Sequence, residues 1–389
     1  LLLILLCLPM IGFGQGWIKT YGIFDEGGGI SVKQTIDGGY IIFGDKIIKT
    51  DSSGDTLWTR NFFAEDGLQT NDGGYILCGF DGGDSFMRLD SQGDTIWTKP
   101  YYGNSIVKAT GGGFVFINNN CSGNPYKNNI NNIKNDKDCS QINLFKTDTL
   151  GNLLWSKTFF EETIYGSTSA SNLVRTSDGG YMIFGYPLIK TDVNGDTLWT
   201  KGYNNGRINY GNKTLDGGYI MTGEYDTIQN GIQLANAIFL LKTDSSGNQT
   251  FEKTYSPPNN FDEIWPGSPL ATSDGGYIMT ATVDNLLAGV MYIIKTDSLG
   301  DTLWTNTFGG PFGWQINEGN NIQQTTDGGY ILSGVFWDGI TPNPGIGGGI
   351  LTVLIKMNHL GTLTSITESP LKTDKRKLLK VTDLLGRET

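Results

Sequence analysis

Short apolar runs of four or five residues recur along the chain, and each follows a turn rich in glycine. Tyr40-Ile-Ile-Phe-Gly44 and Tyr330-Ile-Leu-Ser-Gly334 are two examples, and both come directly after an Asp-Gly-Gly sequence. Apolar runs of this length, bounded by turn residues and rich in β-branched and aromatic side chains, predict short strands rather than helices. The pattern therefore indicates an all-β chain built from hairpins.

Two turn motifs alternate along the sequence, and each occurs seven times. The first is Asp-Gly-Gly-Tyr, with Gly111 in place of the aspartate in the third copy; its aspartates are Asp37, Asp72, Asp178, Asp216, Asp274 and Asp327. The second is Lys-Thr-Asp-x-x-Gly-Asp-x-x-Trp, with Asn358 in the last copy; its first aspartates are Asp51, Asp90, Asp148, Asp192, Asp244 and Asp297. A carboxylate at these positions accepts N–H groups of its own turn, and the glycines allow positive φ. We therefore interpret all twelve aspartates as structural turn residues.

Each repeat reads as four antiparallel strands. In the first repeat the expected strands are Ile30–Thr35, Tyr40–Phe43, Ile47–Thr50 and Thr56–Arg60. The two motifs supply the first-to-second and third-to-fourth turns, so both turns lie at one end of the unit. The other connections vary in length and lie at the opposite end, where binding loops on a rigid scaffold usually reside. The long loops expected there are Asn118–Gln141, Glu224–Asn236, Ala281–Gly289 and Val335–Gly349 within repeats, and Ser256–Ala271 and Gly309–Thr325 between repeats.

The middle strands of a repeat carry apolar residues that do not alternate with polar ones, as in Ile47-Ile48 and Phe239-Leu240-Leu241. Both faces of each sheet therefore have to be covered by neighbouring sheets. Radial stacking of twisted four-stranded sheets is a β-propeller. The sequence thus predicts a seven-bladed β-propeller of four-stranded antiparallel blades over residues 16–366, with the tryptophan of each fourth strand packed between blades.

The two ends of this region predict how the ring closes. Gly16-Trp-Ile-Lys-Thr-Tyr-Gly22 resembles a fourth strand with no first three strands before it, whereas the last repeat has no tryptophan after Lys356. We expect the N-terminal strand to complete the last blade and leave no open edge. The alternative is that Thr362–Ile366 supplies the fourth strand itself.

Charge restricts the partners. The chain of 389 residues has a net charge of −11 and a sequence pI near 4.6. Nucleic acids and anionic membrane surfaces require a basic patch, so neither is an expected partner. Charged residues make up only 17% and aromatic residues 12%, which argues against a disordered chain.

The N-terminal segment is an apolar run over residues 1–14 that is too short to span a bilayer and is followed by small residues. We interpret residues 1–15 as a fragment of a secretory signal peptide, with a buried first strand as the alternative. No later run is apolar for long enough to cross a membrane, so none is expected after signal removal. The predicted localisation is secreted or outer cell surface.

The cysteines fit export. Cys121 and Cys139 flank an insertion rich in asparagine and lysine, and an oxidising compartment favours a disulfide between them. Cys78 lies inside an apolar strand pattern and is expected to be a buried free thiol.

Three tryptophans lie outside the repeat pattern, namely Trp265, Trp314 and Trp337. All three fall on the predicted variable connections of the last two repeats, so we expect them near one another at one end. Exposed aromatic rings stack on sugars or anchor a partner peptide, and we predict a ligand-binding role for the trio. The alternative is that they fill space beneath long loops.

Catalytic and metal-binding signatures are weak. The single histidine, His359, excludes a histidine-based triad or a multi-histidine metal site. Glu161-Glu162 and Asp262-Glu263 are the only adjacent carboxylates considered for glycoside hydrolysis, and solvated loop charges are the simpler interpretation. We expect no enzyme, no metal and no cofactor, with calcium at the aspartate-rich turns as a lesser alternative.

The repeat resembles two known groups. Lys-Thr-Asp-x-x-Gly-Asp-x-x-Trp is similar to the hairpin of bacterial seven-bladed β-propeller repeats in secreted surface proteins, over roughly residues 16–364. It also resembles the structural turns of quinoprotein dehydrogenase propellers and the Asp-box of sialidases, which transfers fold and not activity. The quinoprotein dehydrogenases have eight blades and adjacent cysteines, and neither feature is found here.

The C-terminal segment carries a further resemblance. Ser369-Pro-Leu-Lys-Thr-Asp-Lys-Arg-Lys377 reads as a basic linker. Residues 371–389 resemble the start of a type IX secretion C-terminal sorting domain of Bacteroidota, and Lys380-Val-Thr-Asp-Leu-Leu-Gly-Arg-Glu388 carries the match. This resemblance implies the secretion machinery as a partner, with a linker and a truncated sorting domain over residues 367–389.

Taken together, the sequence favours an exported binding or adhesion scaffold for a glycan or protein ligand. One alternative is a polysaccharide hydrolase or lyase, which needs acidic residues gathered at the loop end or in the central mouth. The other is a structural surface repeat protein that binds no ligand.

Overall fold

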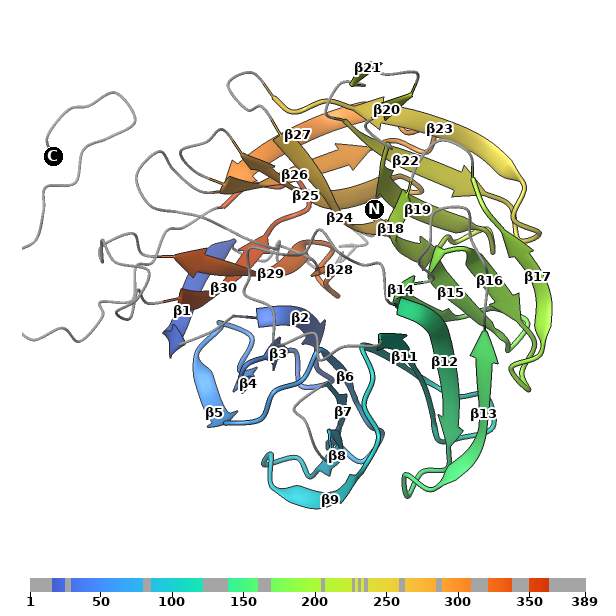
Figure 1. Ribbon diagram of the computed structural model, residues 1–389. Coiled ribbons are helices and arrows are strands. Elements are labelled where there is room, and N and C mark those ends of the chain that lie inside the picture. Colours follow the sequence, from blue (N-terminus) through green and yellow to red (C-terminus); the bar gives the residue numbers. More distant parts are fainter. Residues whose placement is uncertain are drawn as a thin grey trace, which may run out of the picture.

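Seven four-stranded antiparallel sheets surround a central axis in the computed structural model, and no helix occurs in the described residues (Figure 1). The described residues are 16–24, 29–79, 85–121, 139–159, 169–203, 207–225, 228–229, 232–233, 237–258, 263–284, 289–308, 321–337 and 350–363. The predicted seven-bladed β-propeller is confirmed. Residues 1–15 and 364–389, which hold the predicted signal peptide and sorting segment, lie outside the described residues.

In the first four blades the strands follow one another in chain order from the axis outward (Figure 1). Blade one contains β2 (Gly29–Gln34), β3 (Tyr40–Gly44), β4 (Ile47–Thr50) and β5 (Thr56–Arg60); blade two contains β6 (Asp66–Gln69), β7 (Tyr75–Cys78), β8 (Phe86–Leu89) and β9 (Thr95–Lys99). Blade three contains β10 (Ser105–Lys108), β11 (Phe114–Cys121), β12 (Cys139–Thr147) and β13 (Leu153–Phe159); blade four contains β14 (Ser169–Arg175), β15 (Tyr181–Tyr186), β16 (Leu188–Thr191) and β17 (Thr197–Lys201).

The remaining three blades include one added hairpin and the chain closure. Blade five contains β18 (Arg207–Lys213), β19 (Tyr219–Glu224), β22 (Ile238–Thr243) and β23 (Gln249–Tyr255), with the hairpin β20 (Ile228–Gln229) and β21 (Ile232–Gln233) between β19 and β22. Blade six contains β24 (Glu263–Ala271), β25 (Tyr277–Asp284), β26 (Gly289–Thr296) and β27 (Thr302–Phe308). Blade seven contains β28 (Asn321–Gln324), β29 (Tyr330–Trp337), β30 (Ile350–Met357) and β1 (Trp17–Phe24).

The N-terminal strand closes the ring, as the sequence predicts. β1 pairs antiparallel with β30, placing Trp17 opposite Lys356 and Tyr21 opposite Thr352. In Figure 1 the blue β1 lies directly beside the red-orange β30. The rival prediction, a fourth strand from Thr362 onward, is wrong because β1 already occupies the outer edge of β30 and thereby satisfies its backbone groups.

Several connections predicted as long loops are partly strand. The predicted loop Ser256–Ala271 contains β24 from Glu263 onward, and the predicted loop Val335–Gly349 begins with the last residues of β29. Pro266 and Pro269 hide the strand pattern of β24, because proline lacks the N–H that a ladder uses. The register of β24 against β25 shifts between these two prolines, which is where an irregular strand tolerates them.

The blades interlock through a ring-on-glycine contact that repeats at every interface. The fourth-strand aromatic ring of one blade lies over the glycine of the Asp-x-x-Gly turn in the next blade. The pairs are Trp17–Gly54, Trp58–Gly93, Trp97–Gly151, Trp155–Gly195, Trp199–Gly247, Phe251–Gly300 and Trp304–Gly361. Each of these glycines has a positive φ between 74° and 82°, so it serves the turn and the packing together.

A second contact lies two residues beyond each aromatic ring. Lys19 donates from Nζ to Asp55 at 2.8 Å, and Arg60 donates from Nη2 to Asp94 at 2.8 Å. Lys99, Lys157, Lys201 and Lys253 make the equivalent bonds to Asn152, Asp196, Asn248 and Asp301. These exposed pairs contribute little individually, but they set the register between neighbouring outer strands.

Candidate functional site

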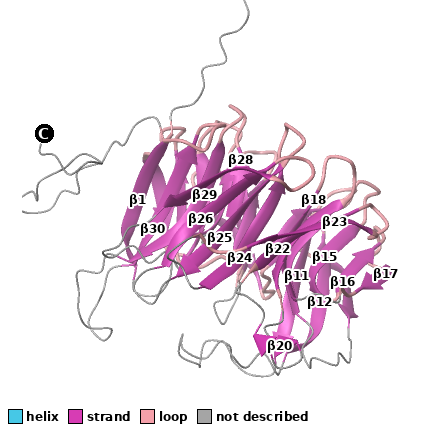
Figure 2. Ribbon diagram, turned by 90° about the horizontal axis from the view of Figure 1, so that it is seen from above, coloured by secondary structure: helices cyan, strands magenta, loops and turns pink. Residues whose placement is uncertain are grey.

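The first strands of all seven blades enclose a central channel with a volume of about 820 Å³. Figure 2 shows the strands standing side by side between the two ends of the ring. The short motif turns lie at one end, here called the turn end, and the variable connections lie at the other. Charged side chains that line the channel are Lys33, Glu65, Asp66, Lys108, Arg175 and Lys213.

One arc of the channel mouth at the turn end is cationic. Lys108, Arg175 and Lys213 occupy the same position, the last residue of the first strand, in three consecutive blades, and all three side chains are exposed. Lys108 donates to the Asn71 side chain at 3.0 Å. Among the described residues, none of the three forms an ion pair. In a chain with a net charge of −11, this concentrates positive potential at one place.

The same position is structural in three other blades. Gln34, Gln69 and Gln324 each accept a hydrogen bond, at 2.8–3.0 Å, from a backbone N–H in the Asp-Gly-Gly turn of the preceding blade. An uncharged glutamine is sufficient to join neighbouring turns. The cationic residues on blades three to five are therefore not required by the fold at this position, which favours a role in binding.

Deeper in the channel, Asp66 joins three blades. Its Oδ1 atom accepts from Ser31 Oγ at 3.1 Å and lies 3.2 Å from Lys33 Nζ, while Oδ2 accepts from the Ile106 N–H at 3.2 Å. The neighbouring Glu65 is affected by its burial and by the charge of Asp66, which together raise its pKa to about 7. Glu65 is thus partly protonated near neutral pH.

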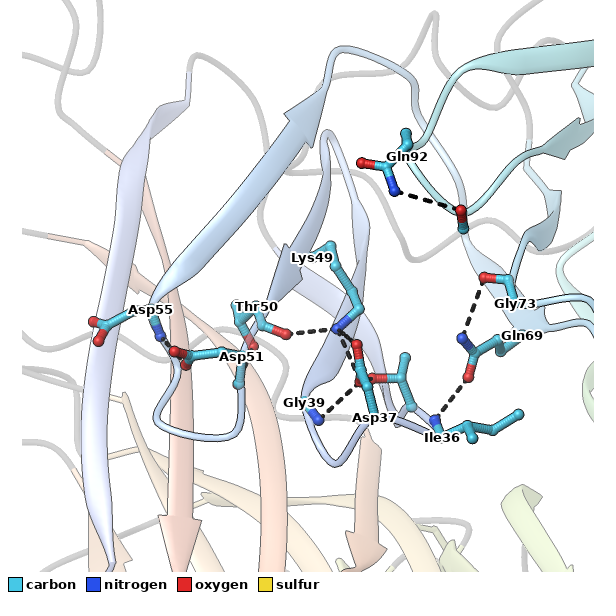
Figure 3. A network of polar contacts seen from close by, with 12 residues as sticks. Ile36, Asp37, Gly39, Lys49, Thr50, Asp51, Asp55, Gln69, Gly73 and Gln92 are labelled. Carbon is cyan, nitrogen blue, oxygen red and sulfur yellow. Dashed lines mark hydrogen bonds and ion pairs between the residues drawn. The ribbon is translucent and has the colours of Figure 1, made fainter.

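In six of the seven blades the two sequence motifs meet in a polar network at the turn end, and Figure 3 shows the network of blade one. In blade one, Asp37 Oδ1 accepts from the Thr35 hydroxyl at 2.5 Å, from the Gly39 N–H at 3.0 Å and from Lys49 Nζ at 3.1 Å. Lys49 is buried and also donates to the Thr50 carbonyl at 2.7 Å. The equivalent ion pairs are Asp72–Arg88, Asp178–Lys190, Asp216–Lys242, Asp274–Lys295 and Asp327–Lys356.

The second set of aspartates caps its own turns. Asp51 Oδ1 accepts from the N–H groups of Ser53 at 2.8 Å and Asp55 at 2.9 Å. Asp90, Asp148, Asp192, Asp244 and Asp297 repeat both bonds with the residues two and four positions further on. The structure thus places all twelve aspartates of the two motifs within turns and not in a shared ligand site.

The ion pairs predict acid sensitivity. Burial of Asp216 opposes its ionisation, but hydrogen bonds from Lys242, Thr214 and the Gly218 N–H outweigh this and lower its pKa to about 2. Because the folded pKa lies below the ordinary value of 3.8, the pair stabilises the fold above about pH 4, and this contribution is lost as the pH falls towards 2. The pKa of each of the other five paired aspartates is lowered as well.

We expect the free energy of unfolding, measured with urea, to fall steeply between about pH 4 and pH 2. Asp216→Asn should lose about 0.5–1 kcal/mol at pH 6, a modest amount because solvent screens the exposed carboxylate. The variant should also show a smaller decline in acid than the unmodified protein. Equal acid declines in the two proteins would contradict this assignment.

The three tryptophans predicted to bind a ligand are placed as follows. Trp265 lies in β24 and is 41% exposed, and Trp337 lies near the end of β29. Both backbone positions belong to the variable end of adjacent blades, but in strands rather than in loops. Trp314 and the Trp337 side chain lie outside what the structure describes, so a shared aromatic site stays a prediction.

The cysteines are also partly described. The backbone pairs Cys121 with Cys139 across β11 and β12, and their side chains lie outside what the structure describes, so the disulfide stays a prediction. Cys78 is a buried free cysteine, as the sequence predicts. Its thiol is completely buried, and this burial raises its pKa well above the ordinary value, so Cys78 packs as an apolar side chain.

Other chemical features of the described residues are few. No group of three or more His, Cys, Asp or Glu side chains is arranged to hold a metal ion within the described part of the chain. None of the structure's described segments forms a helix long and apolar enough to span a membrane. Glu161, Glu162 and Asp262 lie outside the described ranges, and Glu263 begins β24.

Comparisons with known proteins agree on the fold alone. No protein family model matches the chain, and no curated protein is similar to it in sequence. Among solved structures, the WD40 β-propeller domain of Doa1 is similar with a TM-score of 0.52 and 11% identity, covering 87% of this chain and 96% of that chain. The Neurospora crassa Pan2 WD40 domain has a TM-score of 0.51 and 11% identity, covering 88% and 95%.

A bacterial structure is also among the matches. A protein of unknown function from Bacteroides caccae has a TM-score of 0.43 and 9% identity, covering 76% of this chain and 94% of that chain. At 11% identity, the two WD40 domains show a shared β-propeller architecture and transfer no activity.

Proposed function

We propose that this protein is an exported binding scaffold whose ligand contacts the turn end of the central channel. The observation that carries the proposal is the arc of three exposed cations, Lys108, Arg175 and Lys213, on consecutive blades. Each projects from the end of an inner strand that is fixed by the closed ring, so the backbone positions of the three cations are preorganised, whereas their long side chains are ordered on binding. The ligand class is a protein or a glycan that carries negative charge.

A catalytic role has less support. Hydrolysis of a polysaccharide needs two carboxyl groups that flank the scissile bond. Within the described channel, Glu65 lies beside Asp66, but both oxygens of Asp66 are already held by Ser31, Lys33 and the Ile106 N–H. Asp66 therefore acts as a structural anchor between inner strands, and binding without catalysis is the simpler proposal.

The test begins with the full chain on arrays of peptides and glycans, followed by affinity measurements on the best ligand. The variant Lys108→Gln/Arg175→Gln/Lys213→Gln should bind at least about tenfold more weakly, because rim charges govern encounter and steering. The matched control is Thr59→Glu/Thr200→Glu/Thr305→Glu, which changes the net charge by the same amount at exposed positions on outer strands. Equal affinities of the two variants would overturn the proposal.

Export is the second part of the proposal, and it rests on the apolar run over residues 1–14. Removal of residues 1–15 would leave the closing strand intact, because β1 begins at Trp17. N-terminal sequencing of the protein from the cell surface or culture medium should therefore give a start near residue 16. A product that starts beyond Phe24 would lack the closing strand and would contradict the proposed processing.

A further inference from the structure

In six blades an aspartate forms an ion pair with a lysine or arginine at the turn end, whereas blade three has no aspartate at this position. In the six, a threonine two residues before the aspartate donates its hydroxyl to the carboxylate, as Thr35 does to Asp37 at 2.5 Å. In blade three the sequence Thr-x-Asp-Gly-Gly is replaced by Ala109-Thr-Gly-Gly-Gly113. The carboxylate and the hydroxyl that holds it are therefore both missing, while the cation of the set, Lys146, is retained.

Lys146 has no carboxylate partner among the described residues. Its Nζ atom donates to the Thr110 carbonyl at 3.4 Å and lies 6.0 Å from the centre of the Trp155 ring. In contrast, Lys295 Nζ lies 2.9 Å from Asp274 and its side chain is almost fully buried, whereas Lys146 is only half-buried. An added anion stabilises a partly desolvated ammonium group without a carboxylate partner more than it stabilises a fully exposed ammonium group.

The turn of blade three also differs in its backbone. Gly111, Gly112 and Gly113 all have positive φ, at 82°, 99° and 75°, whereas the aspartate turns have one positive-φ glycine each. A Cβ added at Gly111 would meet no atom within 4 Å. The space beside Gly111, which is aligned in sequence with the aspartate of the other blades, is therefore open, but its positive φ is a backbone conformation that an aspartate rarely adopts.

A second, independent feature faces the same place. Tyr181 of blade four is completely buried, and its hydroxyl interacts with the Thr110 backbone of the blade-three turn and with the charge of Arg175. No described carboxylate acts on this hydroxyl. At five other interfaces, the equivalent tyrosine lies close enough to the preceding blade's aspartate for that charge to raise its pKa in addition to burial.

The surrounding charge favours an anion. Arg175 and Lys108, both exposed, flank the Thr110 segment on the inner strands of blades four and three. Two aspartates of neighbouring turns are already engaged, because Asp178 pairs with Lys190 and Asp148 accepts two N–H groups of its own turn. Blade three therefore presents a cationic position that no carboxylate of the described residues neutralises.

We propose that blade three binds an aspartate or glutamate side chain of a partner protein in the place of its missing aspartate. This proposal rests on the proposed function as a binding scaffold and names the class of ligand. The position suits one carboxyl group on a short stem, which an acidic loop of a protein presents. Trp155 is half-buried beneath Lys146 and Tyr181 is buried, so no ring is free to stack on a sugar.

The test restores the missing carboxylate from within the chain. Ala109→Thr/Gly111→Asp recreates the Thr-x-Asp-Gly-Gly sequence of the other blades. Because Gly111 has a φ of +82°, the turn has to adopt the backbone of the aspartate turns for the introduced carboxylate to pair with Lys146. The probe is a synthetic peptide in which Asp and Glu alternate with Gly. Its binding to the full chain is measured by fluorescence anisotropy. The double variant should bind this peptide at least about tenfold more weakly than the unmodified protein.

A second variant removes the cation and leaves the turn unchanged. Lys146→Met should weaken binding of the acidic peptide to a similar extent. A control peptide with Asn and Gln in place of the acidic residues should bind neither the unmodified protein nor this variant. Equal affinity of all three proteins for the acidic peptide would overturn the blade-three site while leaving the scaffold function standing.

Two further outcomes separate the remaining possibilities. If polygalacturonate binds in a way that depends on Lys146 and the acidic peptide does not bind, the partner assignment to a protein is overturned. If neither probe nor any array ligand binds the unmodified chain, the scaffold function itself is overturned. Circular dichroism and urea unfolding of each variant show that the fold is retained.

Discussion

Replacing Trp17 by alanine is expected to lower the free energy of unfolding by about 3–5 kcal/mol, the range for truncating a buried tryptophan. Trp17 is only 8% exposed, its ring meets that of Tyr40 at 5.9 Å in an edge contact, and it lies over Gly54 of blade one. The loss should be large because Trp17 anchors β1, which is joined to the rest of blade seven only by its pairing with β30. Its ring belongs to one buried cluster with Tyr40 of blade one and with Ile331 and Leu354 of blade seven.

The measurement is urea unfolding followed by intrinsic fluorescence and by circular dichroism. Trp265→Ala provides the matched control, because that tryptophan is 41% exposed and its removal should change stability by less than about 1 kcal/mol. A Trp17 variant as stable as the Trp265 variant would show that the closing strand contributes little. That result would contradict closure by β1 as the source of the ring's stability.

Gly195→Ala is expected to destabilise the protein by about 3 kcal/mol, through backbone strain and overpacking together. Gly195 has a φ of +79°, and a Cβ added there would lie 2.7 Å from Cη2 and 2.8 Å from Cζ3 of Trp155. The Trp155 ring also packs against Tyr181, with the ring centres 6.5 Å apart, so it has little freedom to move aside.

Gly38→Ala separates the two contributions. Gly38 has nearly the same φ, +81°, but no atom lies within 4 Å of the position that its Cβ would take. This control should lose only about 1 kcal/mol, the cost of the left-handed backbone alone. Equal losses in the two variants would show that the ring-on-glycine contact does not restrict the interface, whereas a difference of about 2 kcal/mol supports it.

Most of the architecture was predictable because the same pattern of strands and turns recurs from one blade to the next. The strands Ile47–Thr50 and Thr56–Arg60 were predicted with the bounds that the structure gives, since turn residues mark both ends. The role of β1 followed from one unmatched tryptophan strand at the N-terminus. β24 was missed because two prolines interrupt its pattern, although the sheets on either side hold it in place.

The candidate site was predictable only in part. The sequence analysis looked for binding residues among tryptophans of the variable connections, whereas the cationic arc lies at the ends of inner strands. One signal was present in the sequence: Lys108, Arg175 and Lys213 each stand immediately before the alanine or threonine that begins the Asp-Gly-Gly turn or its equivalent. Comparing this position across the repeats, where other blades have glutamine or alanine, would have identified the arc.

By itself, the sequence determined the number of blades, the turns and the strand that closes the ring, because these depend on contacts between residues close in the repeat or at its two ends. Only the tertiary structure decided which blade's ring covers which glycine, which side chains line the channel, and that Lys146 has no carboxylate partner in the described chain. Those facts depend on how separate sheets are oriented about the axis, and a repeat pattern fixes the contents of each sheet without fixing which of its side chains meet those of the next.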